Sequence, residues 1–435
     1  MERYFLEPYR FIPPHRSTFW CRAARGVVMR HLRKNLGIQR WQFRGEEHLR
    51  QSLEQKAGIL LTPNHCRWAD PTMVGLVARH LGAYLYFVAS YHLFRQSKFM
   101  GWFLNRLGGY SIWREGLDRE SIRTTAEILA SAERPVVLFP EGTWFRQNDR
   151  VGLLQDGLSL ITRQAARQST RPIVIHPVGI KYWVLSDPSD EIDRRLERLE
   201  QRLGWSAQRS LSTLARLEKL GGALLGLKEI EFLGSTTPGN LDARLKHLAE
   251  SQVERIERQH LGKKHSGWLL ERIRRLRQHL TRQLLEKTTE AERIIQVRKD
   301  LDDLLFCENL NAQSFDYVSE HPSFERIGET IQRIEETLSD EIERPIAPLG
   351  ATIVVGPAID VRSQAERPGT AGGESLVDQL RTSMQGLIDQ LLEEGPPSAW
   401  GCPSQPTAPR ALSVPTAGRT DPGRAAVPTD GQLIG

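Results

Sequence analysis

The fold is decided by residues 60–71, LLTPNHCRWADP, where an apolar run gives way to a histidine and a carboxylate five positions apart. The apolar residues that end at Thr62 predict a buried strand. Asp70 followed by Pro71 predicts the N-cap and the first position of a helix, and the periodic residues after them continue it. We therefore expect His65 at the carboxyl end of a strand, where α/β proteins bind ligands.

His65 and Asp70 have two interpretations at this point. An imidazole can accept a proton near neutral pH, and a carboxylate within reach can fix its tautomer and stabilise the cation, so the pair predicts a general base and its orienting acid. Alternatively, Asp70 is a helix cap and His65 a structural residue of the turn. Cys66 is also a candidate for the nucleophile of a Cys-His hydrolase, but sequence neighbours usually point apart, which favours a small turn residue.

A second apolar strand, VVLFPEGT at residues 136–143, also ends in a polar turn that carries a carboxylate. The motif Asn-His-x-x-x-x-Asp followed by Phe-Pro-Glu-Gly-Thr resembles the glycerolipid acyltransferase family, whose best-known members acylate lysophosphatidic acid. Two further segments resemble that family's second and fourth blocks, namely GGYSIWR at residues 108–114 and PIVIHPVG at residues 172–179. The four blocks occur in the family's order, and residues 352–359 resemble the strand and turn that close such domains.

The resemblance implies a mechanism and a set of site residues. His65 would act as the base and Asp70 as its orienter, with an acyl thioester on CoA or acyl-carrier protein as co-substrate, no covalent acyl-enzyme, no cofactor and no metal. The implied acceptor is a lysophospholipid similar to 1-acylglycerol-3-phosphate, and Pro177 would shape the acyl-donor side. The residues implied to bind the acceptor are Arg114, Glu141, Gly142, Thr143 and Arg146.

The sequence departs from the family pattern directly after Thr143. Arginine and serine usually follow there, whereas this chain has Trp144 and Phe145, and Arg146 comes two residues late. A displaced guanidinium could still fork onto phosphate oxygens, and a tryptophan could equally line a more apolar pocket. The acceptor is therefore either a glycerophosphate or a different molecule, and a non-catalytic lipid-binding scaffold on the same fold is the rival class.

Apolar strands alternate with helical patterns from residue 45 to 185, which predicts an α/β fold with a mixed, mostly parallel sheet flanked by helices. After residue 185 the composition changes to Arg, Glu, Leu, Gln and Lys with helical spacing, which predicts a large all-helical insertion that interrupts the sheet. The predicted divisions are a basic, aromatic, amphipathic segment 1–44, the core 45–185, the insertion 186–348, a closing strand and helix 349–395, and a disordered tail 396–435.

The insertion carries apolar stripes at helical spacing, of which one comprises Leu269, Ile273, Leu276, Leu280 and Leu284. Such stripes favour helix hairpins that bury one another, and a coiled-coil homodimer through the insertion is the alternative. The same segment carries a basic cluster that we expect on a solvated face: Arg272, Arg274, Arg275 and Arg277.

The positive charge is concentrated at the front of the chain. The formal net charge is +6, whereas residues 1–50 alone contain eleven Lys and Arg against four Asp and Glu, a surplus of seven. Residues 17–36 place apolar side chains on one helical face and arginines on the other, which suits a helix at an anionic membrane surface. An ordinary helix packed on the core is the alternative, and no nucleic-acid-binding module accompanies the basic segment.

The chain has four cysteines, at positions 21, 66, 307 and 402. Their spacing fits neither disulfide pairing nor metal ligation, which predicts a reducing compartment. No apolar stretch approaches about 20 residues, and no signal-peptide pattern is visible. We therefore expect a cytoplasmic protein that is peripheral on the inner face of the membrane.

Overall fold

The structure is a computed structural model that describes residues 9–286, 291–311, 314–339, 344–362 and 375–406. An eight-stranded sheet organises the described chain, and its strands follow the order β1-β7-β6-β2-β5-β3-β4, with β8 paired to β6. Neighbouring strands are parallel except that β7 and β8 run antiparallel to β6. The predicted fold class is confirmed. The strands are β1 (Ile38–Arg44), β2 (Gly58–Pro63), β3 (Tyr86–Ser90), β4 (Gly109–Ile112), β5 (Val136–Val137), β6 (Ile173–Val184), β7 (Leu349–Val355) and β8 (Ile359–Asp360).

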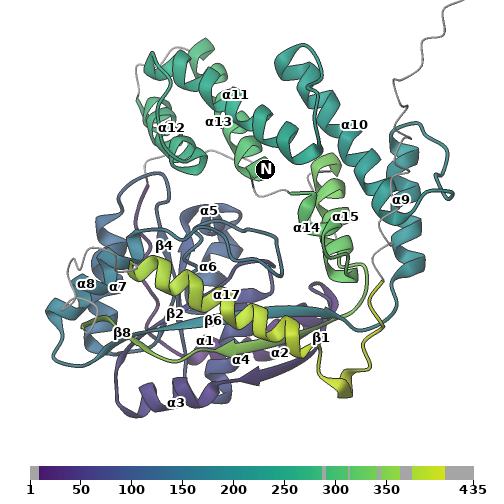
Figure 1. Ribbon diagram of the computed structural model, residues 1–435. Coiled ribbons are helices and arrows are strands. Elements are labelled where there is room, and N and C mark those ends of the chain that lie inside the picture. The colour runs from purple at the N-terminus through teal and green to yellow at the C-terminus, as the bar shows by residue number, and fades with distance from the viewer. Residues whose placement is uncertain (1–8, 287–290, 312–313, 340–343, 363–374, 407–435) are drawn as a thin grey trace, which may run out of the picture.

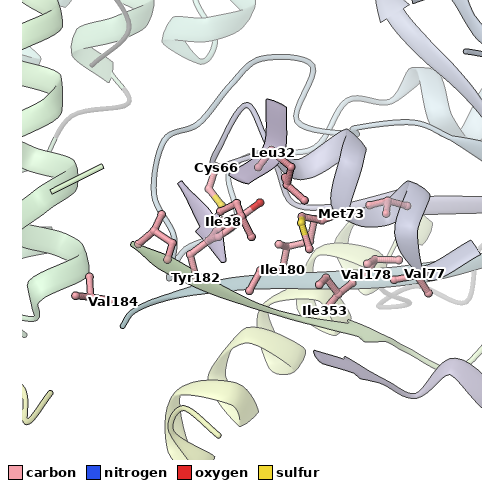
Figure 2. Packing of buried hydrophobic residues seen from close by; sticks show 14 of the residues in the cluster. Leu32, Ile38, Cys66, Met73, Val77, Val178, Ile180, Tyr182, Val184 and Ile353 are labelled. Carbon is pink, nitrogen blue, oxygen red and sulfur yellow. The ribbon is translucent and has the colours of Figure 1, made fainter. Parts of the chain in front are cut away.

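Helices cover both faces of the sheet because each parallel pair needs a crossover connection. Alternate residues of β2 point to opposite faces: Ile59 and Leu61 lie in one apolar core, and Leu60 lies in the other. The first core contains residues of α2 (Arg25–Lys34), α4 (Asp70–His80), α9 (Ser189–Arg202) and α15 (Phe324–Ser339). Figure 2 shows part of it, with Tyr182 and Cys66 in the same cluster as Met73 and Ile180. The second core contains residues of α7 (Arg119–Ser131), α8 (Gly157–Gln168) and α17 (Leu376–Glu394).

The sheet begins upstream of residue 45, because β1 lies within the first 44 residues and pairs with β7. Sequence periodicity did not identify this strand, since it is an edge strand whose side chains are mostly exposed or half-buried. It is preceded by α1 (Phe19–Ala23) and α2, and followed by α3 (Glu46–Glu54). On α2, Leu32 is fully buried in the first core, and on its N-terminal side Ala24 is also buried. Two residues of the apolar face predicted for residues 17–36 thus pack on the core, whereas Val27 of the same face is 64% exposed.

Between β6 and β7 the described chain is helical, and Figure 1 shows α10 to α13 gathered above the sheet. These helices have a core of their own, in which the stripe from Leu269 to Leu284 is buried within the chain. Arg272 is 3% exposed and binds Glu257, so its expected place on a solvated face is wrong. The packing of α11 against α12 thus covers the whole Arg272 side chain. The remaining helices here are α10 (Thr213–Leu233), α11 (Leu241–Leu261), α12 (Leu269–Leu285), α13 (Ala291–Asn311) and α14 (Asp316–Ser319).

After the insertion the chain returns to the sheet as β7, which lies between β1 and β6, and α17 then packs across β6 (Figure 1). Residues 396–406, the start of the segment expected to be a disordered tail, have defined positions. A turn of 3₁₀ helix, Ser398–Trp400, binds Arg40 through its carbonyl groups. The rest of that segment, 407–435, lies outside the described residues. No helix in the described part of the chain is long and apolar enough to cross a membrane.

Candidate active site

The site begins where β2 separates from β6. The two strands pair as far as Pro63, and beyond that point two asparagine side chains take the place of a strand. Asn64 exchanges hydrogen bonds with the backbone of Ile180 at 2.7 and 3.0 Å, and Asn148 does the same with Tyr182 at 2.8 Å each. Buried backbone N–H and C=O groups need hydrogen-bond partners. The two side-chain amides supply them to β6 where β2 leaves the sheet. The residues from His65 onward are thereby free to form a turn.

His65 and Asp70 meet in this turn, as their spacing predicted. The imidazole Nδ1 lies 2.9 Å from Asp70 Oδ2, and the His65 side chain is 22% exposed whereas that of Asp70 is fully buried. A carboxylate only accepts hydrogen bonds, so this contact places the proton of a neutral imidazole on Nδ1 and leaves Nε2 as the basic nitrogen. The ring of Phe139 packs against the imidazole with centroids 4.2 Å apart and limits its rotation. The geometry is that of a positioned base with an orienting acid.

Asp70 is not the N-cap of the following helix, which corrects one expectation. The helix α4 begins at Asp70 itself, and Ala69 occupies the N-cap position without a side-chain bond. The carboxylate faces backward into the turn, where Oδ2 also accepts from the backbone amides of Cys66 and Arg67 at 2.8 Å each. On the other oxygen, the hydroxyl of Tyr182 donates to Oδ1 at 2.6 Å. Asp70 therefore shapes the turn and holds the histidine at once.

Glu141 anchors the same turn from the second motif. Its side chain is buried, and its oxygens accept from the backbone N–H of His65 at 2.9 Å and of Gly152 at 3.2 Å. Burial raises the pKa of Glu141 to about 8. Both oxygens are engaged by the protein backbone, so the structure gives Glu141 a positioning contact with the histidine turn. Its role in acceptor binding stays a prediction.

A cleft of about 1960 Å³ opens beside His65. Its floor consists of α4, the ends of β3 and β4, and residues 138–146, and its far end is formed by α2 and β1. The insertion contributes the opposite wall through residues of α12 and α13, together with Glu336 and Thr337 of α15. An insertion that the sequence placed outside the core thus forms part of the site.

The other predicted acceptor residues line this cleft. Gly142 adopts a φ of +68°, which favours glycine, and Thr143 follows it on the cleft wall. Arg114 lies at the end of β4, with Nη2 3.7 Å from Glu308 Oε1, and Arg146 is paired with Glu336. The structure therefore brings the predicted arginines to the cleft, and each of them faces a carboxylate of the insertion.

Trp144, which stands where the family usually has arginine, also lines the cleft. It contacts Trp68 edge-on at 5.2 Å, and the guanidinium of Arg146 lies 4.3 Å from its ring centroid. Pro177 is different: it lies within β6 opposite Thr62, and its carbonyl accepts from the backbone of Gly356 at 2.8 Å. That position is in the sheet, outside the residues that line the cleft.

Cys66 does not suit a nucleophile. Its side chain is 4% exposed, and burial raises the pKa of the Cys66 thiol well above its ordinary value. A buried protonated thiol beside the Asp70 carboxylate is a packing residue. The turn is also joined to the insertion, because Arg67 lies 3.4 Å from Glu329 of α15 and stacks on Tyr182.

Sequence reasoning missed several residues that shape this site. Asn64 was part of a recognised motif, so its position in the pattern was a signal for it. Tyr182 had no such signal, because it lies 112 residues from Asp70 in sequence, within an unbroken apolar strand. Glu308 and Glu336 come from helices whose many charges look alike in the sequence.

Comparison with known proteins adds one finding to this geometry. Residues 40–181 match the family model described as Acyltransferase, over the segment that contains β1 to most of β6. No curated protein shows a significant match to the chain. The match agrees with the resemblance that the four motifs indicated.

Proposed function

We propose that this chain, whose residues 40–181 match the Acyltransferase family model, transfers an acyl group from a thioester to the hydroxyl of a lipid acceptor. The observation that carries this proposal is the contact between His65 Nδ1 and the buried Asp70 carboxylate at the edge of the cleft. It leaves Nε2 to accept a proton from a substrate. The motif resemblance supports a donor on CoA or acyl-carrier protein and a monoacyl lipid acceptor, which is either a lysophospholipid or a molecule without the glycerophosphate group.

The proposed reaction has one addition and one elimination. His65 Nε2 takes the proton of the acceptor hydroxyl while the hydroxyl oxygen attacks the thioester carbonyl carbon, forming the new C–O bond. The C–S bond then breaks, and the imidazolium returns its proton to the departing thiolate. Asp70 stabilises the imidazolium between these steps, and no acyl group is attached to the protein.

The charges along the cleft support an anionic donor carrier. Arg25 and Arg33 of α2 and Arg79 of α4 line the end formed by the N-terminal segment. Clefts lined by one sign of charge concentrate ligands of the opposite sign. The phosphates of CoA, or the acidic surface and phosphopantetheine of a carrier protein, match this end.

A thiol-release assay tests the proposal. We expect His65→Ala to lose about a hundredfold to ten-thousandfold in turnover with acyl-CoA or acyl-carrier protein, which is the usual contribution of a positioned base. The matched control is His80→Ala, because His80 lines the same cleft but is paired with Glu46 on the surface. Normal turnover by the His65 variant, with the fold verified by circular dichroism, would contradict the assignment.

The same assay separates an enzyme from a scaffold. A panel of lysolipids and other hydroxyl or amine acceptors should include at least one that accelerates thiol release by the wild-type chain. Lipid binding without thiol release from any donor and acceptor pair would favour the scaffold on the same fold.

Attachment to the inner face of the membrane is part of this proposal. Exposed aromatic side chains support it, because Phe19 of α1 is 63% exposed and Phe99 of α6 (Lys98–Arg106) is 68% exposed. Phe19 contacts Trp20, Phe99 contacts Trp102, and the two tryptophans contact each other with ring centroids 4.9 Å apart. Aromatic rings favour the interface of a bilayer, and the surrounding arginines and lysines favour anionic lipid.

A further inference from the structure

Both arginines expected to bind the acceptor are matched by carboxylates of the helical insertion. Arg114 Nη2 lies 3.7 Å from Oε1 of Glu308 on α13, and Arg146 pairs with Glu336 on α15. All four residues line the cleft that contains His65. The glutamate side chains are 14% and 11% exposed, so they are largely covered by protein.

The pairing extends around Arg114 into a balanced cluster. Glu308 also binds Arg277 of α12, at 2.6 Å, and Arg277 binds Glu115, the neighbour of Arg114. Two guanidinium groups and two carboxylates thus carry no net charge. Among the other insertion residues that line the cleft, Arg274 of α12 adds a positive charge and Asp302 of α13 adds a negative one.

The Arg146 guanidinium contacts two groups of the folded chain. Its guanidinium lies between the Glu336 carboxylate and the face of Trp144, and its backbone has a φ of +59°, which is unusual for a residue other than glycine. A substrate phosphate bound by Arg146 would therefore lie beside the Glu336 carboxylate. The adjacent Trp68 and Trp144 provide an apolar surface in the same region.

From this charge balance we infer that the acceptor headgroup is uncharged, as in a glyceride alcohol, and that Glu308 and Glu336 determine this selectivity. The inference rests on the proposed acyl transfer and names the acceptor class for it. A phosphate monoester carries about −1.5 to −2 charge at pH 7, more than Arg274 alone can balance. Bound at either arginine, it would lie beside a largely covered glutamate of like charge. A neutral hydroxyl group makes no such demand, and it can donate to either carboxylate.

The test compares two acceptors that differ only in phosphate: a monoacylglycerol and the lysophosphatidic acid with the same acyl chain. Catalytic efficiency, kcat/KM, is measured for each by thiol release at one ionic strength. We expect the wild-type chain to prefer the monoacylglycerol by at least about tenfold, a factor that corresponds to about 1.4 kcal/mol. This ratio requires no variant, so it remains interpretable if a substitution impairs folding.

The variants then identify the residues responsible. Glu308→Gln and Glu336→Gln, alone and together, should move the preference toward lysophosphatidic acid by about tenfold or more, mainly through a lower KM for that acceptor. Glu250→Gln is the matched control, because Glu250 pairs with Arg272 in the insertion but lies outside the cleft lining. It should leave the ratio unchanged.

Two outcomes would overturn the inference. One is a wild-type preference for lysophosphatidic acid, which would mean that the arginines leave their glutamates readily when a phosphate arrives. The other is an unchanged ratio in the double variant, which would assign selectivity to other residues. Failure of the proposed function looks different, since no acceptor would then accelerate thiol release and the His65 variant would behave as the wild-type chain.

Discussion

Tyr182→Phe tests whether the support of Asp70 from β6 contributes to catalysis. The tyrosine hydroxyl donates to Asp70 Oδ1 at 2.6 Å, and both side chains are fully buried. Phenylalanine keeps the ring and its packing and removes one oxygen atom. Burial raises the pKa of Tyr182 well above its ordinary value, so the wild-type hydroxyl remains a donor throughout the range of an activity assay.

The size of the effect follows from the partners that remain. Among donors from the described residues, Oδ1 then retains only the Cys66 thiol, at 3.9 Å. Oδ2 keeps His65 and two backbone amides. Loss of a hydrogen bond to a buried charged group costs about 1.5–3 kcal/mol of folding free energy. If half of the smaller value is also lost in the transition state, turnover falls about threefold to fourfold.

The variant should lower turnover even where it is fully folded, because Asp70 loses one of the groups that position it beside the histidine. A purely structural role for Tyr182 would lower stability and leave the turnover of the folded chain unchanged.

Thiol release measured well below the melting temperature, together with thermal unfolding, distinguishes these cases. The matched control is Tyr110→Phe, because Tyr110 is equally buried and bonds Thr125 at 2.7 Å, away from the histidine turn. It should lose stability and keep the wild-type turnover while folded. Equal turnover by the two folded variants would refute the contribution of Tyr182 to the proposed base.

Two further predictions concern stability and membrane binding. The pKa of Glu141 is raised in the folded chain from 4.5 to about 8, so its contribution to stability is present below about pH 4.5 and is lost as the pH rises to 8. Glu141→Gln should remove this part of the pH dependence of the unfolding free energy, measured with urea. The same dependence on pH in the variant and the wild-type chain would count against the raised pKa. Alanine at Phe99 and Trp102 should weaken sedimentation with anionic vesicles severalfold in high salt, where charge is screened. Trp268→Ala, an exposed tryptophan of the insertion, is the control, and an equal loss there would move the contact surface.

Local periodicity was sufficient for most core elements. The apolar runs predicted β2 and β5, and the periodic residues after Asp70 predicted α4, because each depends on residues near in sequence. The prediction failed for β1, IQRWQFR, whose polar side chains belong to an edge strand that gains its place by pairing with β7 some 300 residues later. The family-like segment at residues 172–179 also covers only the first part of β6, which continues to Val184 because β7 and two asparagine side chains satisfy its backbone.

The contacts of the site likewise divide into those that local sequence predicts and those that only the fold brings about. Five residues of sequence suffice to join His65 to Asp70, so spacing alone predicted that contact. Contacts across the fold had no local pattern: Glu308 and Glu336 are two among many glutamates in polar helices, and only packing brings them to the cleft. Arg277 was expected on a solvated face for the same reason, yet it binds Glu115 of the core. Charged helices disclose which face is apolar but not which charges will be covered.

Asp70 shows why the structural and the catalytic interpretation of a short motif need not exclude each other. It is the first residue of α4, where the positive end of the helix dipole favours a negative charge. The amides of Cys66 and Arg67 stabilise the same carboxylate, so a fully buried aspartate can remain an acceptor for the His65 N–H. Asp70→Asn should therefore impair both the turn and the proposed base, because an amide has a single acceptor oxygen and cannot accept from all of these donors. The helix end and the two backbone amides stabilise the charged carboxylate, and the same carboxylate orients the His65 imidazole.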